Sequence, residues 1–484
     1  MRAEFRRSGL AAGDRVALWS PNHPGWGVVY LAVTTGPTVV VPLLPDFSPT
    51  DAANVLSHAG VRALVVGRSL GEVWSRWLAA APEAVCGPLA NLKVWILEEL
   101  IEESGSGTGD EPLAEQASDD LAALIYTSGT TGAPKGVMLT HGNITSNVVA
   151  AAPIPGFVPG DRILSVLPLA HTYECTLGFL IPLHEGIHIG YLNKPPAPAV
   201  LLPILASFRP HAMLTVPLLM EKIYRAKVRP VLSRPLFKHL RKIPGFDWVL
   251  TRLIGAKLKK TFGGRLKFFG VGGAALAPEV ARFLHRSGFP YAIGYGLTET
   301  SPLVAGHLKA RLYSTGRILN KVQVKIGEPR NEQGAGEILV KGPNVMVGYY
   351  HDPVRTAEVF TPDGWFRTGD LGLFSGDQLF IKGRSKNLIL GPSGENIYPE
   401  AIEALLNQNR LVVESLVLQR GAEIVAKVVL DGEHTTEAIE AYLAELRSQI
   451  NEQLARFSRL SFLEFQREPF EKTATLKIKR YLYA

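Results

Sequence analysis

One segment limits the fold of this chain more than any other: LIYTSGTTGAPKGVMLTHGN, at positions 124–143. The apolar run at 121–126 predicts a buried strand, which leads into a loop rich in glycine and hydroxyl residues. Glycines free the backbone to turn its N–H groups toward an anion, and hydroxyls and a lysine add donors and positive charge. A phosphate-binding loop is therefore predicted from Thr127, Ser128, Gly129, Thr130, Thr131, Gly132 and Lys135. It is not the common P-loop, because G-x-x-x-x-G-K-[ST] does not occur here.

Composition restricts the class of protein further. With 484 residues, 46% of them apolar and 20% charged, the chain is globular and long enough for more than one domain. Its two cysteines, Cys86 and Cys175, exclude a disulfide framework and a cysteine-rich metal site. Residues 1–20 lack the apolar core of a secretory signal, and glycine and proline interrupt the apolar stretch at 21–45. The sequence therefore predicts a cytoplasmic protein without a membrane span.

The order of apolar runs predicts an α/β fold followed by a smaller unit. Short apolar runs alternate with helix-like intervals over the first 110 residues, and the rhythm returns at 163–220 and 265–305, which favours parallel sheets layered with helices. After about residue 320 the runs alternate apolar and polar residues, as in a smaller sheet. Beyond Gly383 a segment rich in glycine, serine and proline precedes a compact tail. We place a domain boundary close to Lys386.

Two shorter motifs carry a carboxylate each. In GYGLTETSP at 294–302, Glu299 stands between two threonines, and Mg²⁺ prefers one carboxylate combined with phosphate oxygens. In GWFRTGDLG at 364–372, Asp370 lies in a predicted turn bounded by glycines, where it is suited to accept hydrogen bonds from ribose hydroxyls. Taken alone, each carboxylate could equally cap a loop or a turn.

The segment GVGGAA at 270–275 raises a different interpretation. It follows a strand-like run and precedes a helix opened by Pro278, so it fits a relaxed dinucleotide-binding pattern. That pattern expects an acidic residue about 20 positions further on, at the end of a second strand. Since the corresponding interval contains none, we reject a dinucleotide-binding domain.

Together these motifs resemble the adenylate-forming superfamily of acyl-CoA synthetases, aryl-CoA ligases, luciferases and peptide-synthetase adenylation domains. YTSGTTGAPKG, YGLTET, WFRTGD, GRSK with GENIYPE, and the terminal KIKR occur in the family's order. The resemblance implies a large α/β domain at 1–385, with layered mixed sheets, helices and a small β-barrel-like part. A small mobile α+β domain at 386–484 follows. Family members usually carry a further segment before GDRVAL at 13–18, so we expect the large domain here to lack it.

The resemblance also implies roles for residues around a bound nucleotide. The loop Thr127–Gly132 with Lys135 resembles the family's pyrophosphate-handling loop. Thr298 resembles the contact to the α-phosphate, and Glu299 resembles the Mg²⁺ ligand, with Thr127 as its helper. The adenine-side wall is implied to consist of Gly273, Ala274, Ala275, Tyr295 and Gly296, and the ribose-binding pair of Asp370 and Arg384.

Three further roles concern the acyl group and the small domain. His171, in LPLAHTYE, resembles the residue beside the acyl pocket, and Lys386 occupies the hinge position between the domains. Lys477 resembles the lysine that the small domain inserts between the substrate carboxylate and the α-phosphate. Attack of a carboxylate on a phosphate joins two anions, so such a cation neutralises charge where it develops.

The implied reaction uses ATP and Mg²⁺ to convert a carboxylic acid to an acyl-adenylate, which then reacts with the thiol of the co-substrate CoA. LPLAHTYE, EKIY at 221–224 and PFEKTATLKIKRYLY favour the branch that activates medium-chain and long-chain fatty acids. Two alternatives stay open. The chain could load a carrier-protein thiol instead of CoA, or, lacking its leading segment, bind acyl groups or nucleotides without catalysis.

A basic stretch at 222–267 holds 14 lysines and arginines but one acid, Asp247. It is either a solvated, partly helical insertion or, with its interleaved apolar residues, a surface for peripheral contact with an anionic membrane. We expect no nucleic-acid partner, because no recognition motif accompanies the charge. The interleaved residues are Leu232, Leu236, Phe237, Leu240, Phe246, Trp248, Leu250 and Leu253.

Overall fold

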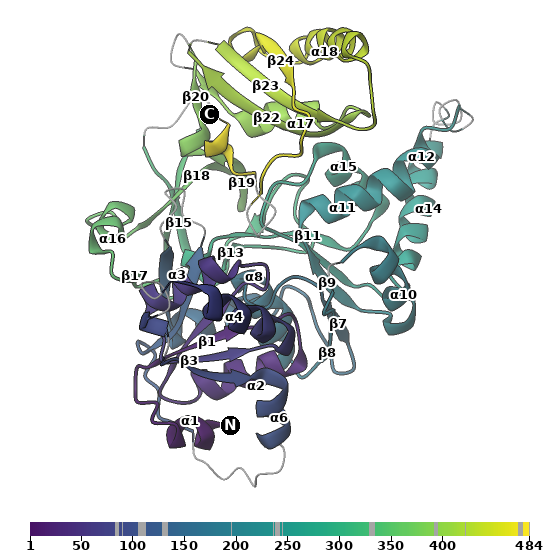
Figure 1. Cartoon of the computed structure of the whole chain (residues 1–484). Coiled ribbons are helices and arrows are strands. Elements are labelled where there is room, and N and C mark those ends of the chain that lie inside the picture. Colours follow the sequence, from purple (N-terminus) through teal and green to yellow (C-terminus); the bar gives the residue numbers. More distant parts are fainter. Residues whose placement is uncertain are drawn as a thin grey trace.

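The structure is a computed structural model that describes most of the chain (Figure 1). The described residues are 1–82, 87–89, 91–104, 113–127, 134–194, 196–235, 237, 243, 245–328, 334–391, 395–421, 423–472 and 478–483. The predicted α/β class is confirmed, since mixed sheets alternate with helices along the chain.

The N-terminal part forms a seven-stranded sheet in the order β17-β6-β5-β2-β1-β3-β4. Its strands are β1 (Arg15–Trp19), β2 (Val39–Leu43), β3 (Ala63–Val66), β4 (Lys93–Ile96), β5 (Leu121–Thr127), β6 (Lys135–Thr140) and β17 (Gly348–Tyr349). The first five pair in parallel, whereas β6 is antiparallel to both β5 and β17. The central strands β1, β2 and β3 are almost entirely apolar and buried, as expected for parallel strands covered on both faces.

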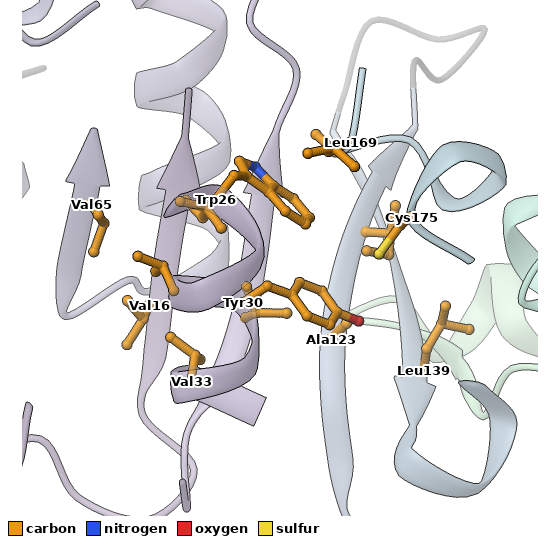
Figure 2. Packing of buried hydrophobic residues seen from close by; sticks show 14 of the residues in the cluster. Val16, Trp26, Tyr30, Val33, Val65, Ala123, Leu139, Leu169 and Cys175 are labelled. Atoms are coloured by element: carbon orange, nitrogen blue, oxygen red, sulfur yellow. The ribbon is translucent and has the colours of Figure 1, made fainter. Parts of the chain in front are cut away.

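Helices cover this sheet and join it to the next part of the chain. They are α1 (Arg2–Arg7), α2 (Pro24–Thr34), α3 (Pro49–Ala59), α4 (Arg68–Ala80), η1 (Gly87–Leu89), α6 (Leu97–Ser104) and α7 (His141–Ala151). Figure 2 shows α2 packed over the strands, with Trp26 and Tyr30 stacked at 5.2 Å between ring centroids. The same apolar cluster includes Leu169 and Cys175, so the first sheet shares one core with the segment that follows β7 (Arg162–Ser165).

A second, all-parallel sheet has the order β11-β10-β9-β7-β8. Its strands are β7 (Arg162–Ser165), β8 (His188–Tyr191), β9 (Ala212–Thr215), β10 (Phe268–Val271) and β11 (Tyr291–Ile293). The accompanying helices are α8 (Thr172–Glu174), η2 (Cys175–Leu180), α9 (Ile181–His184), α10 (Pro198–Phe208), α11 (Pro217–Ile223), η3 (Tyr224–Val228), α12 (Arg229–Leu232), α14 (Phe246–Thr261) and α15 (Pro278–Ser287). The basic stretch therefore runs mainly through η3, α12 and α14, on the side of this sheet seen at the right of Figure 1.

Between the second sheet and the tail, the chain forms a five-stranded antiparallel sheet in the order β14-β19-β18-β16-β15, where a β-barrel-like part was expected. Its strands are β14 (Gly316–Arg317), β15 (Gln323–Ile326), β16 (Gly336–Lys341), β18 (Phe366–Ser375) and β19 (Gln378–Arg384). Short elements flank it: β12 (Tyr295–Gly296), η4 (Thr298–Thr300), β13 (Leu303–Ala305) and α16 (Pro353–Val359). The placement of Asp370 in a turn was wrong, because the residue pairs with Arg384 within β18 and β19.

The C-terminal part has a core of its own, formed mainly by the inner faces of its two longer helices and three-stranded sheet. Its elements are η5 (Ser385–Asn387), β20 (Ile389–Leu390), β21 (Asn396–Ile397), α17 (Pro399–Leu406), β22 (Val412–Arg420), β23 (Glu423–Leu430), α18 (Thr436–Asn451), η6 (Arg456–Ser458), β24 (Phe462–Phe465) and η7 (Arg480–Leu482). Figure 1 shows these elements gathered at one end of the molecule. The boundary at Lys386 falls in η5 and stays a prediction.

Candidate active site

Three segments far apart in sequence meet at Glu299. The carboxylate Oε1 lies 2.9 Å from Nζ of Lys135, the first residue of β6, and accepts a hydrogen bond of 2.9 Å from the hydroxyl of Tyr349 in β17. The Lys135 ammonium also stands 4.1 Å from the centroid of the Tyr349 ring. The antiparallel pairing of β6 with β5 and β17 therefore brings the end of the predicted phosphate loop to the TET motif.

The protonation states of Glu299 and Tyr349 follow from burial and from the contacts within this cluster. Burial alone would raise the pKa of Glu299, but the charge and hydrogen bond of Lys135, together with the Tyr349 hydroxyl, outweigh it, so the pKa lies below its usual value. Burial and the Glu299 charge raise the pKa of Tyr349. The site thus holds an ionised carboxylate between an ammonium and a protonated phenol.

Hydrogen bonds to its backbone carbonyls hold the turn that carries Glu299. The Met346 amide donates to the Glu299 carbonyl at 2.9 Å, and Asn344 Nδ2 donates to the Thr300 carbonyl at the same distance. Asn147, on α7, donates to the carbonyl of Leu303 at 2.6 Å. Because these amides satisfy buried carbonyls, they hold the backbone that carries Glu299 in place.

A second buried carboxylate, Asp370 of β18, contacts Tyr295 at the start of the GYGLTET segment. The Tyr295 hydroxyl donates to Asp370 Oδ2 at 3.0 Å, and Arg384 Nε lies 2.9 Å from Asp370 Oδ1. Burial and the Asp370 charge raise the pKa of Tyr295, so its phenol remains a donor. Tyr295 and Glu299 are four residues apart, which limits their backbones to about 14 Å.

The predicted adenine-side wall follows β10 as an exposed loop. Gly273 has φ = +87°, a conformation that favours glycine, and Ala274 and Ala275 are exposed beside it. The backbone of Gly296 approaches the next turn so closely that a Cβ there would lie 1.8 Å from the Pro302 carbonyl oxygen. The local backbone therefore explains why positions 273 and 296 are glycines. Their contact with adenine stays a prediction.

The remaining predicted residues are distributed around this region. His171 precedes α8, and its Nδ1 accepts from the Tyr173 amide at 3.2 Å. Thr127 ends β5 opposite Lys135, and Thr298 begins η4, half-buried. Lys386 is exposed in η5. Ser128, Gly129, Thr130, Thr131, Gly132 and Lys477 lie outside the described residues.

Tyr349 belongs to this cluster although no sequence motif indicates it. Its phenol contacts both ionic groups of the cluster, yet VGYYHDP resembles no phosphate or metal motif. The signal that could have found it is the aromatic pair after Gly348, in a segment otherwise typical of a turn.

We asked whether these residues fit Mg²⁺. Within the described ranges, no group of three or more histidine, cysteine, aspartate or glutamate side chains could form an all-protein metal cage. Mg²⁺ does not need such a cage when a substrate supplies phosphate oxygens, since one carboxylate then suffices. Glu299, ionised and held in place, fits that requirement, and the Thr127 side chain stands on the strand paired with Lys135.

Comparison with known families gives one match over most of the chain. The family model described as AMP-binding enzyme matches residues 3–350. Long chain acyl-CoA synthetase 7, peroxisomal, from Arabidopsis thaliana is 30% identical over 450 residues, which cover 84% of this chain and 63% of that protein. A probable acyl-activating enzyme 16 from the same plant is 30% identical over 545 residues, covering 93% of this chain and 73% of that protein.

This chain therefore spans less than two thirds of the length of the long chain acyl-CoA synthetases 7 and 6, at 63% and 66%. A third relative, long-chain-fatty-acid–CoA ligase FadD15 from Mycobacterium tuberculosis, is 29% identical over 446 residues, covering 85% of this chain and 72% of that protein.

Solved structures share the fold over the whole chain. ATP-bound MatB from Rhodopseudomonas palustris superimposes with a TM-score of 0.80 and 25% identity, covering 99% of this chain and 90% of that structure. The o-succinylbenzoate CoA synthetase MenE from Bacillus subtilis, in complex with AMP, gives a TM-score of 0.77 at 22% identity, with 100% and 90% covered. These neighbours have the same arrangement of a large N-terminal and a smaller C-terminal domain.

Proposed function

Because the chain belongs to the family of AMP-binding enzymes, we propose that it activates a medium-chain or long-chain fatty acid with ATP. The acyl-adenylate then reacts with CoA to give acyl-CoA, AMP and pyrophosphate. The observation that carries this proposal is the cluster of Lys135, Glu299 and Tyr349, built next to the Tyr295–Asp370–Arg384 group on one short segment. The two groups are close enough for one nucleoside triphosphate to place its phosphates at the first and its ribose at the second.

The cluster suggests how charge is managed during adenylation. In the free protein Glu299 neutralises Lys135. An arriving triphosphate offers Lys135 stronger anionic partners and leaves the Glu299 carboxylate, still hydrogen-bonded by Tyr349, for Mg²⁺. When bound, Mg²⁺ neutralises charge on the phosphate oxygens. Lys477, the lysine we assign to the reacting carboxylate, supplies the remaining positive charge.

Asp370 is proposed to hold the ribose, and replacing it tests that role. We expect Asp370→Asn to raise the Kd for ATP about tenfold, because each hydrogen bond to a charged acceptor contributes roughly 1.5–3 kcal/mol. Calorimetric titration with a non-hydrolysable ATP analogue measures the change. Asp377→Asn, which removes an exposed ion pair with Arg317 on the same sheet, is the control. Equal affinity in both variants and the wild type would exclude Asp370 from the nucleotide site.

The acid and the thiol acceptor are proposed from the relatives, which are named as long-chain acyl-CoA synthetases and ligases. The direct test offers acids from acetate to palmitate and one aryl acid, with CoA and a holo-carrier protein in parallel. Mass spectrometry of the thioester identifies both partners. Palmitoyl-CoA as the main product supports the proposal, whereas acylated carrier alone would favour the carrier-loading alternative. Bound nucleotide without any thioester would favour the non-catalytic binder.

A cytoplasmic site of action with peripheral membrane contact is part of the proposal. Among the described residues, no helix is both long enough and apolar enough to cross a membrane. The exposed face of α14 instead combines Trp248 and Leu253, 54% and 64% exposed, with Arg252, Lys257 and Lys260. Such a face fits the interface of an anionic bilayer. The expectation that Leu250 also belongs to this face was wrong, because Leu250 packs into the core of the second sheet.

Vesicle sedimentation tests this face. On vesicles that contain phosphatidylglycerol, the double variant Trp248→Ser, Leu253→Ser should bind about tenfold more weakly, since two partly inserted apolar side chains are lost. Wild-type binding should also weaken as salt increases. Val354→Ser, at a 70% exposed valine on α16, is the control. Equal binding by all three proteins would refute membrane contact through α14.

A further inference from the structure

Two arginines of the large domain hold the small domain by its backbone. Arg225, in η3, donates from its two terminal nitrogens to the carbonyls of Val412 at 3.1 Å and Asn407 at 2.8 Å. Arg229, one turn further along at the start of α12, donates to the carbonyl of Gln408 at 2.7 Å. The arginines and their acceptors are about 180 residues apart in sequence, which makes this a tertiary contact between the two predicted domains.

The acceptors suit a cation. Helix α17 ends at Leu406, and Asn407 and Gln408 continue its last turn. Carbonyls at a helix C-terminus lack partners within the helix and carry its partial negative charge. Two guanidinium groups at this end therefore donate hydrogen bonds to the free backbone carbonyls. Their positive charges also interact favourably with the negative end of the helix dipole.

Two carboxylates of the large domain interact electrostatically with the arginines. Glu221 and Glu279 are half-buried, and burial raises the pKa of both carboxyl groups. The charge of Arg225 acts in the opposite direction on both, and that of Arg229 on Glu279. Glu221 Oε1 also accepts a hydrogen bond of 2.9 Å from the Ala277 amide. Ala277 directly precedes α15 and lies two residues after Ala275, at the end of the exposed glycine loop. The carboxylate that feels the charge of Arg225 thus also bonds to the backbone that follows the predicted adenine-side loop.

We propose that Arg225 and Arg229 are positioning residues that latch the small domain in the orientation seen here. Rotation of the small domain about Lys386 would break all three hydrogen bonds. These bonds therefore lower the population of the rotated orientation. This inference rests on the proposed two-step reaction only for its kinetic consequence. The contact itself can be measured without any activity.

Hydrogen exchange of the full chain tests the contact. In the double variant Arg225→Ala, Arg229→Ala, backbone amides at 405–415 should exchange at least about fivefold faster than in the wild type, while the core of the first sheet is unchanged. Arg282→Ala is the matched control, because Arg282 lies near Glu279 but donates to Pro278 within its own helix. Unchanged exchange at 405–415 would overturn the proposal.

The rates of the two half-reactions test the positioning role. Acid-dependent ATP–pyrophosphate exchange reports adenylation, and acyl-CoA formation reports the whole cycle. The ratio of these rates should change at least about threefold in the double variant, not change in Arg282→Ala, and return toward the wild-type value in Arg225→Lys, Arg229→Lys. Faster exchange at 405–415 with an unchanged ratio would reduce the arginines to a structural contact and overturn the positioning role. If the wild type releases no pyrophosphate, the proposed function fails, and the hydrogen-exchange result still decides on the latch.

Discussion

Replacing Glu299 with glutamine is expected to slow acyl-adenylate formation by about 10²–10³-fold, a loss of about 2.7–4 kcal/mol of transition-state stabilisation. The substitution keeps the size of the side chain but removes the charge that balances Lys135 and that would hold Mg²⁺. Pyrophosphate exchange at saturating ATP measures the effect.

Two further variants show whether the slower rate comes from the loss of the Glu299 charge. Tyr349→Phe removes one hydrogen bond to the carboxylate and leaves its charge, so we expect a smaller loss, about tenfold. Glu464→Gln removes an ion pair with Arg420 on the small domain and should leave the rate unchanged. A folded Glu299→Gln protein with a rate within threefold of the wild type would contradict the role given to this carboxylate.

Replacing Glu174 with glutamine is expected to stabilise the protein at pH 8 by several kcal/mol. Glu174 is fully buried, and neither carboxyl oxygen makes a hydrogen bond of normal geometry to a described residue. Burial raises the pKa of Glu174 to about 8, and nearby polar groups of Ser165, Val166 and Leu167 lower it only in part. Gly178 leaves room for the carboxyl group, since a Cβ there would lie 2.7 Å from it.

The sign of the pH dependence follows from this raised pKa. Below about pH 4.5 the carboxyl group is protonated in both the folded and the unfolded chain, so its titration costs nothing. As pH rises toward 8, the unfolded chain gains stability by ionising while the folded chain stays protonated, so the free energy of unfolding falls by an amount on the order of 4 kcal/mol. Because glutamine cannot ionise in the unfolded chain, the free energy of unfolding of the variant does not fall in this way.

Urea unfolding at pH 5 and pH 8 measures this difference. The stability gain of Glu174→Gln over the wild type should be small at pH 5 and several kcal/mol at pH 8. Glu358→Gln, at an exposed position on α16, should track the wild type at both values. A gain that is the same at pH 5 and pH 8 would show that the buried group does not titrate in this range.

Much of the fold could be predicted because its elements are local patterns. The apolar runs within the first 110 residues became the buried strands β1, β2 and β3. Such a run is visible in the sequence because a parallel strand covered on both faces is apolar along its whole length.

The candidate site was harder to predict because it depends on distant pairings. Lys135 and Glu299 are 164 residues apart and meet only through the tertiary fold, in which β6 pairs with β5 and β17. The same pairing brings in Tyr349, which no motif marked. Asp370 was misplaced since its flanking glycines are typical of a turn, whereas the strand accommodates them at a bulge near Leu371 and Gly372. Exposure within the basic stretch also followed from tertiary packing, which buries Leu250 and leaves Trp248 outside.

The most direct test of the central claim is pyrophosphate release with Mg-ATP and CoA, with and without palmitate, by the wild type and by Lys477→Ala. We predict release that requires the fatty acid and falls at least about 100-fold in the variant, equivalent to about 2.7 kcal/mol of barrier. Folded wild-type protein that releases no pyrophosphate with any acid, or a variant as fast as the wild type, would contradict it.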